Sequence, residues 1–591
     1  MSALIKSMIK VPAAFLLCGC LFGQTHQPSS TRSAKPEAAT SFSVAYQQGV
    51  AAVQAGDLAR AQAEFEQAVK LNPQDANSQT ALGWVYIATN QPTKALDHLR
   101  RAVKIAPTVE PGHAYLAEAL RLTGALQESE SEFRIALKLN NADADAHRGL
   151  ARIMTARGEI DTAIVEMRRA AELPPQRAEL YDDLGSLLLN KGDAAAAIEQ
   201  IRMALQLNPQ SPSAQAHHGI ALFKQGDTAT ALATLTRASS LPGAPPETDY
   251  YIGLILEQQG NIQDAVKALE RFVDEQPRSP DALRRLGQLL QRLGKPKLAQ
   301  ERFSQLAKLT PDDPDAHNNL ALSLLQTGQA DNAIKEFNAA IQLRPADASL
   351  RENLAVALLQ KSDFEGAISE FRRALAITPN SANLHYNLGV ALKLKDQLND
   401  SVEELKRAIG LDPKLTDAHY TLGVIYWQKG DFVPAAEQLR AAVEGKPDFA
   451  EAHYLLGSVL KQMDKLPEAA TSLREAIRLQ PDLLGAHTNL AGVLQQMGDT
   501  AGAEAERKTA AVISKSNVQH QSAVFSTNSG ILLLSKEDVD GAISQFRSAI
   551  QAAPEYAAAH YQLGLAYQKK GLLSDAQAEF KKASDLDPEY R

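Results

Sequence analysis

A glycine or alanine returns every 34 positions along this 591-residue chain. The series holds its step through fourteen members, slips once by five residues, and then gives two more. A fixed period of this length indicates a stack of similar units, each contacting mainly its neighbours, rather than one large globular core. The sixteen small residues are Gly49, Gly83, Ala117, Ala151, Gly185, Gly219, Gly253, Gly287, Ala321, Ala355, Gly389, Gly423, Gly457, Ala491, Gly530 and Gly564.

Each unit has the pattern of two amphipathic helices. With the small residue numbered 8 in a unit of 34, positions 4, 7, 8 and 11 share one helical stripe, and positions 20, 24 and 27 share another. Glycine at position 15 predicts the turn between the helices, and proline at position 32 ends the second helix because it lacks an N–H. We expect small residues at 8 and 20 to let the helices approach closely, and a large apolar residue at 24 to fill the seam toward the next unit.

This pattern resembles the tetratricopeptide repeat (TPR), and the resemblance covers residues 42–590. It implies an all-α fold, a right-handed α-solenoid (superhelix) of about sixteen 34-residue helix-turn-helix units. We expect the chain to divide into a signal peptide at 1–23, a flexible linker at 24–41, TPR units 1–6 at 42–245, units 7–14 at 246–517, an insertion at 518–522, and units 15–16 at 523–591.

Two breaks interrupt the regular pattern. The proline-rich stretch "SSLPGAPPETD" at 239–249 separates units 6 and 7, and we expect the array to bend there. In unit 14, Arg507 stands at the large apolar position and Lys515 replaces the proline, just before the five extra residues. We therefore expect units 15 and 16 to move separately from the units before them.

The first 23 residues have the pattern of an export signal. Two lysines precede an apolar run of thirteen residues, which is too short to span a bilayer because a span needs about 20. Its "LCGC" resembles the lipobox that the bacterial lipoprotein signal peptidase cleaves, which would leave Cys20 as the lipidated first residue. The alternative is an ordinary secretory signal cut near Gly23 and Gln24. We expect an exported lipoprotein, periplasmic or anchored to the outer membrane, or otherwise a secreted soluble protein.

The composition and the absence of several motifs disfavour other classes of protein. A net charge of −8 at 22% charged residues is typical neither of a disordered chain nor of a nucleic-acid binder. Cys18 and Cys20 are the only cysteines, so they supply no internal disulfide framework or structural zinc site. Phosphate-loop, nucleophile-elbow, dinucleotide, HExxH and CxxC motifs are all absent from the sequence. We predict no enzymatic activity, no catalytic or metal-binding residue, and no cofactor.

Eight of the thirteen histidines stand at position 4 of their units. Packed helices are about 8 to 10 Å apart, whereas zinc ligands lie about 2 Å from the metal, so histidines 34 residues apart cannot share one metal site. We interpret them as packing against the partner helix, and we interpret His217 and His218, at positions 6 and 7, in the same way. The eight are His113, His147, His317, His385, His419, His453, His487 and His560.

Asparagine recurs at position 6 in "HNNLA", "ENLA" and "HYNLG". These words resemble the TPR portion of O-linked N-acetylglucosamine transferase, in which asparagines at this position line the inner groove. No segment here resembles the catalytic domain of that enzyme, so the resemblance implies a binding surface, or a regulatory relative that lacks the catalytic domain. The matching residues are Asn319, Asn353, Asn387, Asn489 and Asn528.

The face of the first helix opposite its buried stripe lines the concave surface in TPR superhelices. Units 11 to 13 place three tyrosines and a tryptophan in register on this face. Such a groove suits an extended or helical peptide with acidic and apolar groups, although tyrosines here can also simply buttress neighbouring helices. The candidate groove residues are Tyr386, Asn387, Val390, Lys393, Tyr420, Val424, Trp427, Tyr454 and Lys461, with Asn319 and Asn353 from units 9 and 10.

These observations predict a protein-protein interaction scaffold whose concave groove binds peptide segments of partner proteins, in assembly of an envelope or secretion complex. Its expected partners are proteins, and a membrane through the lipid anchor, but no nucleic acid. A saccharide-binding scaffold for polysaccharide export is the alternative, because tyrosines and asparagines in a groove also bind sugars.

Overall fold

The computed structural model describes residues 36–590, all of them in helices or in the turns between helices. The predicted signal peptide, Cys20 and the predicted linker up to residue 35 lie outside the described residues. The first described helix begins at Pro36, so the last six residues of the predicted linker are helical, and a proline is well suited to a first helical turn. Among residues 36–590, none of the helices combines the length and the hydropathy that a membrane span requires.

The chain divides into two compact units between Leu309 and Thr310, each made of many TPR units. The terms first unit and second unit refer to these two compact units, whereas the TPR units keep their numbers from 1 to 16. Helices of the first unit are α3 (Pro36–Gln54), α4 (Leu58–Leu71), α5 (Ala76–Ala88), α6 (Pro92–Ile105), α7 (Glu110–Leu122), α8 (Leu126–Leu139), α9 (Ala144–Ala156), α10 (Ile160–Glu172), α11 (Ala178–Lys191), α12 (Ala194–Leu207), α13 (Pro212–Lys224), α14 (Thr228–Ser239), α15 (Glu247–Gln258), α16 (Ile262–Glu275), α17 (Pro280–Arg292) and α18 (Pro296–Leu309).

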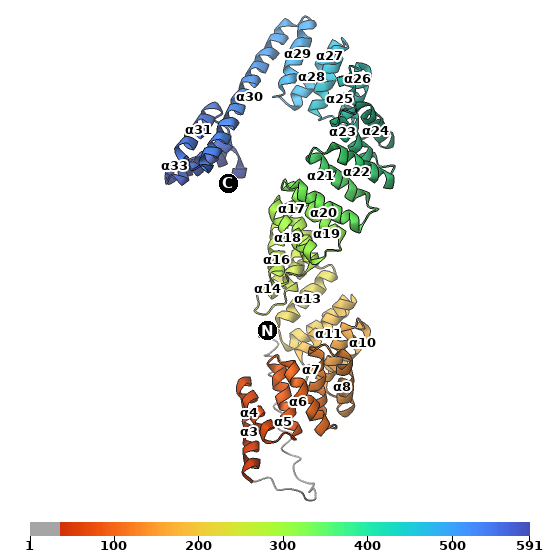
Figure 1. Ribbon diagram of the computed structural model, residues 1–591, viewed down its shortest axis with the longest axis vertical. Helices are drawn as coiled ribbons and strands as arrows, with labels where there is room; N and C mark the ends of the chain where they lie inside the picture. Colours follow the sequence, from red (N-terminus) through yellow and green to blue (C-terminus); the bar gives the residue numbers. More distant parts are fainter. Residues whose placement is uncertain (1–35, 591) are drawn as a thin grey trace. The chain divides into compact units, whose positions relative to one another are not determined.

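Helices of the second unit are α19 (Pro314–Gln326), α20 (Ala330–Leu343), α21 (Ala348–Gln360), α22 (Phe364–Ile377), α23 (Ala382–Leu394), α24 (Leu398–Leu411), α25 (Thr416–Lys429), α26 (Phe432–Gly445), α27 (Ala450–Gln462), α28 (Leu466–Leu479), α29 (Leu484–Gln496), α30 (Thr500–Ser535), α31 (Val539–Ala552), α32 (Ala557–Lys569) and α33 (Leu573–Leu586), followed by a short 3-10 turn at Pro588–Tyr590. Within each of the two compact units, consecutive helices pair as hairpins and each hairpin packs on the next, as Figure 1 shows.

Residue 245, where we expect TPR units 6 and 7 to meet, lies in the turn between α14 and α15. Leu235 of α14 and Ile252 and Ile255 of α15 belong to one continuous buried core. The proline-rich stretch therefore replaces an ordinary turn between hairpins without interrupting the core.

Position 15 adopts the left-handed backbone conformation in every unit. Eleven of these residues are glycines, such as Gly430 with φ of 81°, and the remaining five include Asp396 with φ of 61°. A left-handed residue after the last helical turn reverses the chain at little cost when it is glycine. The glycine pattern that predicted the turns is confirmed.

Position 24 packs over position 8 of its own hairpin. A Cβ atom added to Gly423 would lie 2.8 Å from Cγ of Leu439, and one added to Gly83 would lie 2.4 Å from Cγ of Leu99. The sequence assigned position 24 to the seam between units, which is incomplete: because the two helical stripes face each other, this side chain first fills the interior of its own hairpin. Glycine or alanine at position 8 makes room for it.

One helix departs from the hairpin pattern. α30 runs for 36 residues and fuses the second helix of unit 14 with the first helix of unit 15, so the predicted insertion at 518–522 is helical (Figure 1). No glycine or proline occurs between Gly502 and Gly530, and Lys515 stands where other units have a proline. Nothing in the sequence therefore stops the helix at the expected place.

The eight histidines at position 4 form hydrogen bonds that connect their hairpins to the preceding turn. All eight rings place Nε2 within 3.3 Å of the backbone carbonyl six residues earlier, and seven also place Nδ1 within 2.7 Å of a glutamate or glutamine nineteen residues later, on the second helix. Packing against the partner helix is confirmed. The described residues hold no cluster of three or more potential metal ligands.

His317 illustrates the bridge and its dependence on pH. Nδ1 lies 2.7 Å from Glu336, and Nε2 lies 3.0 Å from the carbonyl of Pro311. Burial lowers the pKa of His317, but the bonds to Glu336 and Pro311 outweigh it, and the pKa is raised overall. Both acceptors favour an imidazolium that donates from both nitrogens.

We expect His317→Ala to destabilise the second unit by about 1 to 3 kcal/mol at pH 6, because the glutamate and the carbonyl lose a shared donor. A raised pKa in the folded state means that the stabilisation is full below the unfolded pKa, about 6.5, and is lost as the pH rises through the folded pKa. The difference from wild type in chemical unfolding should therefore shrink at pH 9. Gln215, at position 4 of unit 6, donates to the Pro209 carbonyl through an amide that does not ionise, and it supplies the control: a Gln215→Ala cost that varies equally with pH would contradict the account.

Candidate partner-binding face

The candidate residues lie on five consecutive first helices of the second compact unit, α19, α21, α23, α25 and α27. Neighbouring first helices approach one another more closely than neighbouring second helices do, so the first-helix face is the concave one. In Figure 1, α21, α23 and α25 follow one side of the array, and α22 and α24 follow the other. The structure thus brings the side chains predicted from units 9 to 13 to one face.

The three tyrosines at position 5 are half-buried against the following hairpin. The Tyr386 hydroxyl is hydrogen-bonded to Thr421, and burial raises the pKa of Tyr386. The ring of Tyr420 lies 4.7 Å, centre to centre, from that of Phe449. The hydroxyl of Tyr454 is so close to Gly485 that an added Cβ would lie 2.8 Å from it. These tyrosines therefore fix the spacing of successive first helices, and part of each remains accessible.

Trp427 is the most accessible aromatic side chain of the candidate set, with 40% of its surface exposed, and it stands at position 12 of α25. Lys393 and Lys461 hold the same position on the first helices before and after it. Val390 on α23 and Val424 on α25 are half-buried. Burial lowers the pKa of Lys393, with no carboxylate nearby to oppose the effect. The amine of Lys461 packs over Gly492, where an added Cβ would lie 2.9 Å from Nζ.

Lysines two residues further along behave differently. Lys395 forms an ion pair with Glu365 at 2.7 Å, and Lys429 donates to the Asn399 side chain at 2.9 Å. Among residues 36–590, the side-chain amines of Lys393 and Lys461 form no ion pair and no hydrogen bond. The concave face therefore carries two unpaired cations beside an exposed indole.

The asparagines at position 6 serve the array itself. Asn353 donates to the Asn318 side chain at 3.0 Å and Asn387 donates to Glu352 at 2.9 Å, in each case the residue at position 5 of the preceding unit. Asn319 is half-buried on the same face. The amide N–H groups of Asn353 and Asn387 are thus already used between units, which the sequence resemblance did not reveal.

In the first compact unit, the corresponding contacts between positions 5 and 6 of consecutive TPR units involve charged side chains. Arg148 pairs with Asp183 at 2.7 Å, and Nδ1 of His217 lies 2.7 Å from buried Asp182. Burial alone would lower the pKa of His217, but the hydrogen bond to Asp182 and the charge of Asp182 together have the larger effect, so the pKa is raised overall. His217 is therefore an inter-unit ion-pair partner rather than a packing residue, whereas burial lowers the pKa of its neighbour His218.

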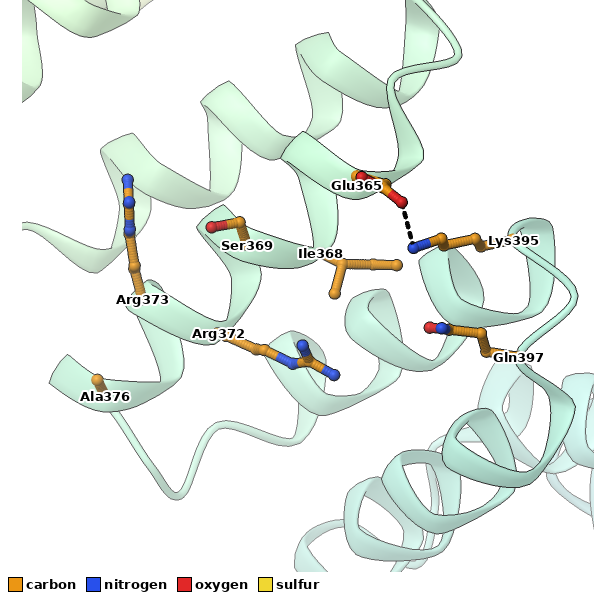
Figure 2. Close-up of a pocket in the computed structure, with 8 residues that line it drawn as sticks. All are labelled: Glu365, Ile368, Ser369, Arg372, Arg373, Ala376, Lys395 and Gln397. Atoms are coloured by element: carbon orange, nitrogen blue, oxygen red, sulfur yellow. Dashed lines mark ion pairs between the residues drawn. The ribbon is translucent and has the colours of Figure 1, made fainter.

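A hollow of about 510 Å³ on the second-helix side was not predicted from the sequence. Figure 2 shows the Lys395–Glu365 pair on its rim and the Arg372 side chain extending into it. A smaller hollow of about 410 Å³ occurs one repeat later, around Lys406. Each hollow is lined by the basic residue at position 25 of its unit, Arg372 in the first and Lys406 in the second. The sequence shows these residues, but the shape of the hollows depends on the spacing of successive second helices.

Family models of the tetratricopeptide repeat match most of the described chain. One matches residues 46–110, 183–245, 250–294, 284–348 and 420–483; a TPR repeat model matches 357–396, 391–430 and 530–571; and a third, again of the tetratricopeptide repeat, matches 557–590. The chain belongs to the TPR family, and its fold is an all-α solenoid of TPR units. No curated protein matches its sequence.

Solved TPR structures resemble parts of the chain. The crystal structure of the APC/C hetero-tetramer Cut9–Hcn1 is 16% identical, over 77% of this chain and 96% of that one, with a TM-score of 0.33. YrrB, described as a TPR protein with an unusual peptide-binding site, is 24% identical over 31% of this chain and 95% of its own, with a TM-score of 0.28. MamA from Desulfovibrio magneticus RS-1, residues 41 to the end, is 25% identical over 29% and 96%, with a TM-score of 0.27.

The fold and the family define a protein-interaction scaffold. TPR units run through the described chain, and this fold is typically non-catalytic. TPR proteins in general bind protein or peptide partners.

Proposed function

We propose that the concave face around Trp427 binds a peptide segment that carries both an acidic and an apolar side chain. The observation that supports this proposal is the exposed indole of Trp427 between two unpaired lysines, Lys393 and Lys461. An apolar side chain of the peptide would pack on the indole. Its carboxylates would pair with the two amines, which have no acidic partner within the array.

Burial of Lys393 sharpens the argument. A partly desolvated ammonium without a counter-charge is unfavourable, so a carboxylate brought by a ligand recovers more free energy there than it would at a fully solvated lysine. The buttressed tyrosines hold successive helices in place, which lowers the entropy lost when a peptide binds.

A peptide array that varies acidic and apolar positions independently, probed beside an oligosaccharide array, tests this proposal. We expect binding to peptides that carry both features, weakened by salt and by Lys393→Gln. The control Lys395→Gln removes a neighbouring lysine that already has Glu365 as its partner, and should leave binding unchanged. Binding to sugars with none to peptides would favour the polysaccharide-export alternative.

We further propose that the protein acts in the bacterial envelope, in assembly of a membrane or secretion complex, and is held there by lipidated Cys20. The lipobox-like "LCGC" and the linker after it support this proposal. A tether between anchor and array would let the concave face reach partners away from the membrane surface.

Cys20→Ala, or inhibition of the lipoprotein signal peptidase with globomycin, should alter this localisation. We expect loss of acyl-label incorporation for Cys20→Ala, and release of the protein from the membrane fraction after cleavage at an alternative site. Cys18→Ala is the matched control and should leave both readouts unchanged. Unlabelled wild-type protein would rule out the lipid anchor and leave an ordinary secretory signal.

A further inference from the structure

The long helix α30 carries large apolar side chains that face solvent. Val518 is 64% exposed, Phe525 74% and Leu532 56%. They are spaced by seven residues, so consecutive members differ in direction by about 20°, and Val518 and Leu532 by about 40°, on a helix with 3.6 residues per turn. Together they form one narrow apolar stripe, which we call the α30 stripe.

Phe525 and Leu532 occupy repeat positions that are buried elsewhere. Position 3 is buried in units 2 to 14 and in unit 16, and so is position 10. Among residues 36–590, both positions are exposed only in unit 1, at Val44 and Ala51, and in unit 15. The buried residues at position 3 are Ser78, Gly112, Ala146, Leu180, Ala214, Thr248, Ala282, Ala316, Leu350, Leu384, Ala418, Ala452, Ala486 and Ala559.

The reason lies in the continuity of α30. In a regular junction the second helix of the preceding unit packs beside the first helix, as Leu384 shares a core with Ile368 and Phe371 of α22. At unit 15 the preceding second helix runs in line with the first helix and cannot fold back over it. A helix-packing surface that is filled in the regular units is therefore open here.

Serines separate the apolar residues of the stripe. Ser522 and Ser529 stand four residues after Val518 and Phe525, so the series 518, 522, 525, 529 and 532 has the alternating steps of four and three found in helix-pairing seams. Large and small side chains thus alternate along one line. Two such lines pack best when the large residues of one face the small residues of the other.

We propose that the α30 stripe pairs with the same stripe of a second copy of this chain, in antiparallel orientation about a twofold axis. In this register Phe525 faces Ser522 of the second copy, Val518 faces Ser529, and Leu532 packs on the aliphatic stem of Lys515. A parallel pair would instead place Phe525 against Phe525 and serine against serine, which leaves gaps beside crowded layers.

Charge also favours a second copy over a charged partner. Between residues 509 and 535 the helix carries one lysine, Lys515, and no acidic residue, so a self-pair brings no like charges together at its centre. The next lysine, Lys536, follows the helix directly. The inference is independent of the peptide site, because α30 contributes no residue to that site.

Sedimentation equilibrium of the purified chain over a hundredfold range of concentration tests the inference. We expect a reversible dimer, and Phe525→Glu should weaken it at least about tenfold because a charge enters the central layer. The control Val433→Glu puts the same charge at another apolar residue, 59% exposed on α26, and should leave the dimer intact. Wild-type monomer at all concentrations, or dimers that ignore Phe525→Glu, would overturn the proposal.

Cross-linking of the unmodified chain reports the orientation. Within one chain, Lys515 and Lys536 are 21 residues apart, about 31 Å along a straight helix, beyond the reach of a short amine-reactive linker. In the antiparallel pair, Lys536 of the second copy lies about one helical turn from Lys515. We expect a Lys515–Lys536 link confined to the dimer band, whereas Lys515–Lys515 links would overturn the antiparallel arrangement.

Discussion

Replacement of Phe371 by alanine is expected to destabilise the hairpin of α21 and α22 by about 3 to 5 kcal/mol. Phe371 is fully buried at position 24 and shares a core with Ala355, Ala374 and Leu388, three residues on three different helices. Neighbouring side chains are held by rigid helices and cannot collapse into the space that the ring leaves. The loss therefore includes both the buried apolar surface and a residual cavity.

Hydrogen exchange is the appropriate measurement, because a linear array unfolds in parts rather than all at once. We expect amides of α21 to α24 to exchange much faster in Phe371→Ala, with little change beyond the adjacent hairpins. Phe371→Leu is the control: leucine already fills position 24 at Leu405 and Leu439, so its cost should stay below about 1.5 kcal/mol. Protection unchanged in α21 to α24 would contradict the assignment of position 24 to the core.

The hairpin pattern could be predicted because it depends on residues that repeat. Position 8 is small and position 24 is large in fifteen of the sixteen units, and the structure places them in contact, as Gly423 and Leu439 illustrate. A single departure such as Arg507 at position 24 was visible as a break, but its outcome was not. Five extra residues can form either a flexible loop or part of a continuous helix, and only the lack of glycine and proline in this segment favours the helix.

The candidate site was less predictable, because it depends on contacts between units. Helical periodicity placed Tyr386 and Trp427 on the same face, yet it could not tell that the first is wedged against the next hairpin and the second is not. It also could not separate Lys393 from Lys395. Whether a lysine is paired depends on the distance to a carboxylate 30 residues earlier, such as Glu365, and that distance is set by the rise from one hairpin to the next.

Trp427→Ala is expected to weaken peptide binding by about 2 kcal/mol or more while the array stays folded. An indole that is 40% exposed leaves little cavity when it is removed, so the cost in stability should fall well short of the 3 to 5 kcal/mol, roughly, of a core aromatic such as Phe371. Affinity should suffer more, because the indole offers the apolar contact at the centre of the face. Isothermal titration calorimetry measures this loss directly, with a peptide selected on the peptide array titrated into the wild-type protein and into Trp427→Ala.

Lys393→Ala and Lys461→Ala should act mainly through salt-sensitive association, because a cation beside the anchor steers an acidic peptide toward it. Trp84→Ala, at the only other tryptophan of the chain and in the first unit, is the control for tryptophan loss and should leave affinity unchanged. Phe371→Ala should reduce binding only to the extent that it unfolds α21 and α22. If Trp427→Ala unfolds the protein as severely as Phe371→Ala, or binds the peptide as tightly as wild type, then Trp427 belongs to the core or to an inert surface, and the peptide site must lie elsewhere on the array.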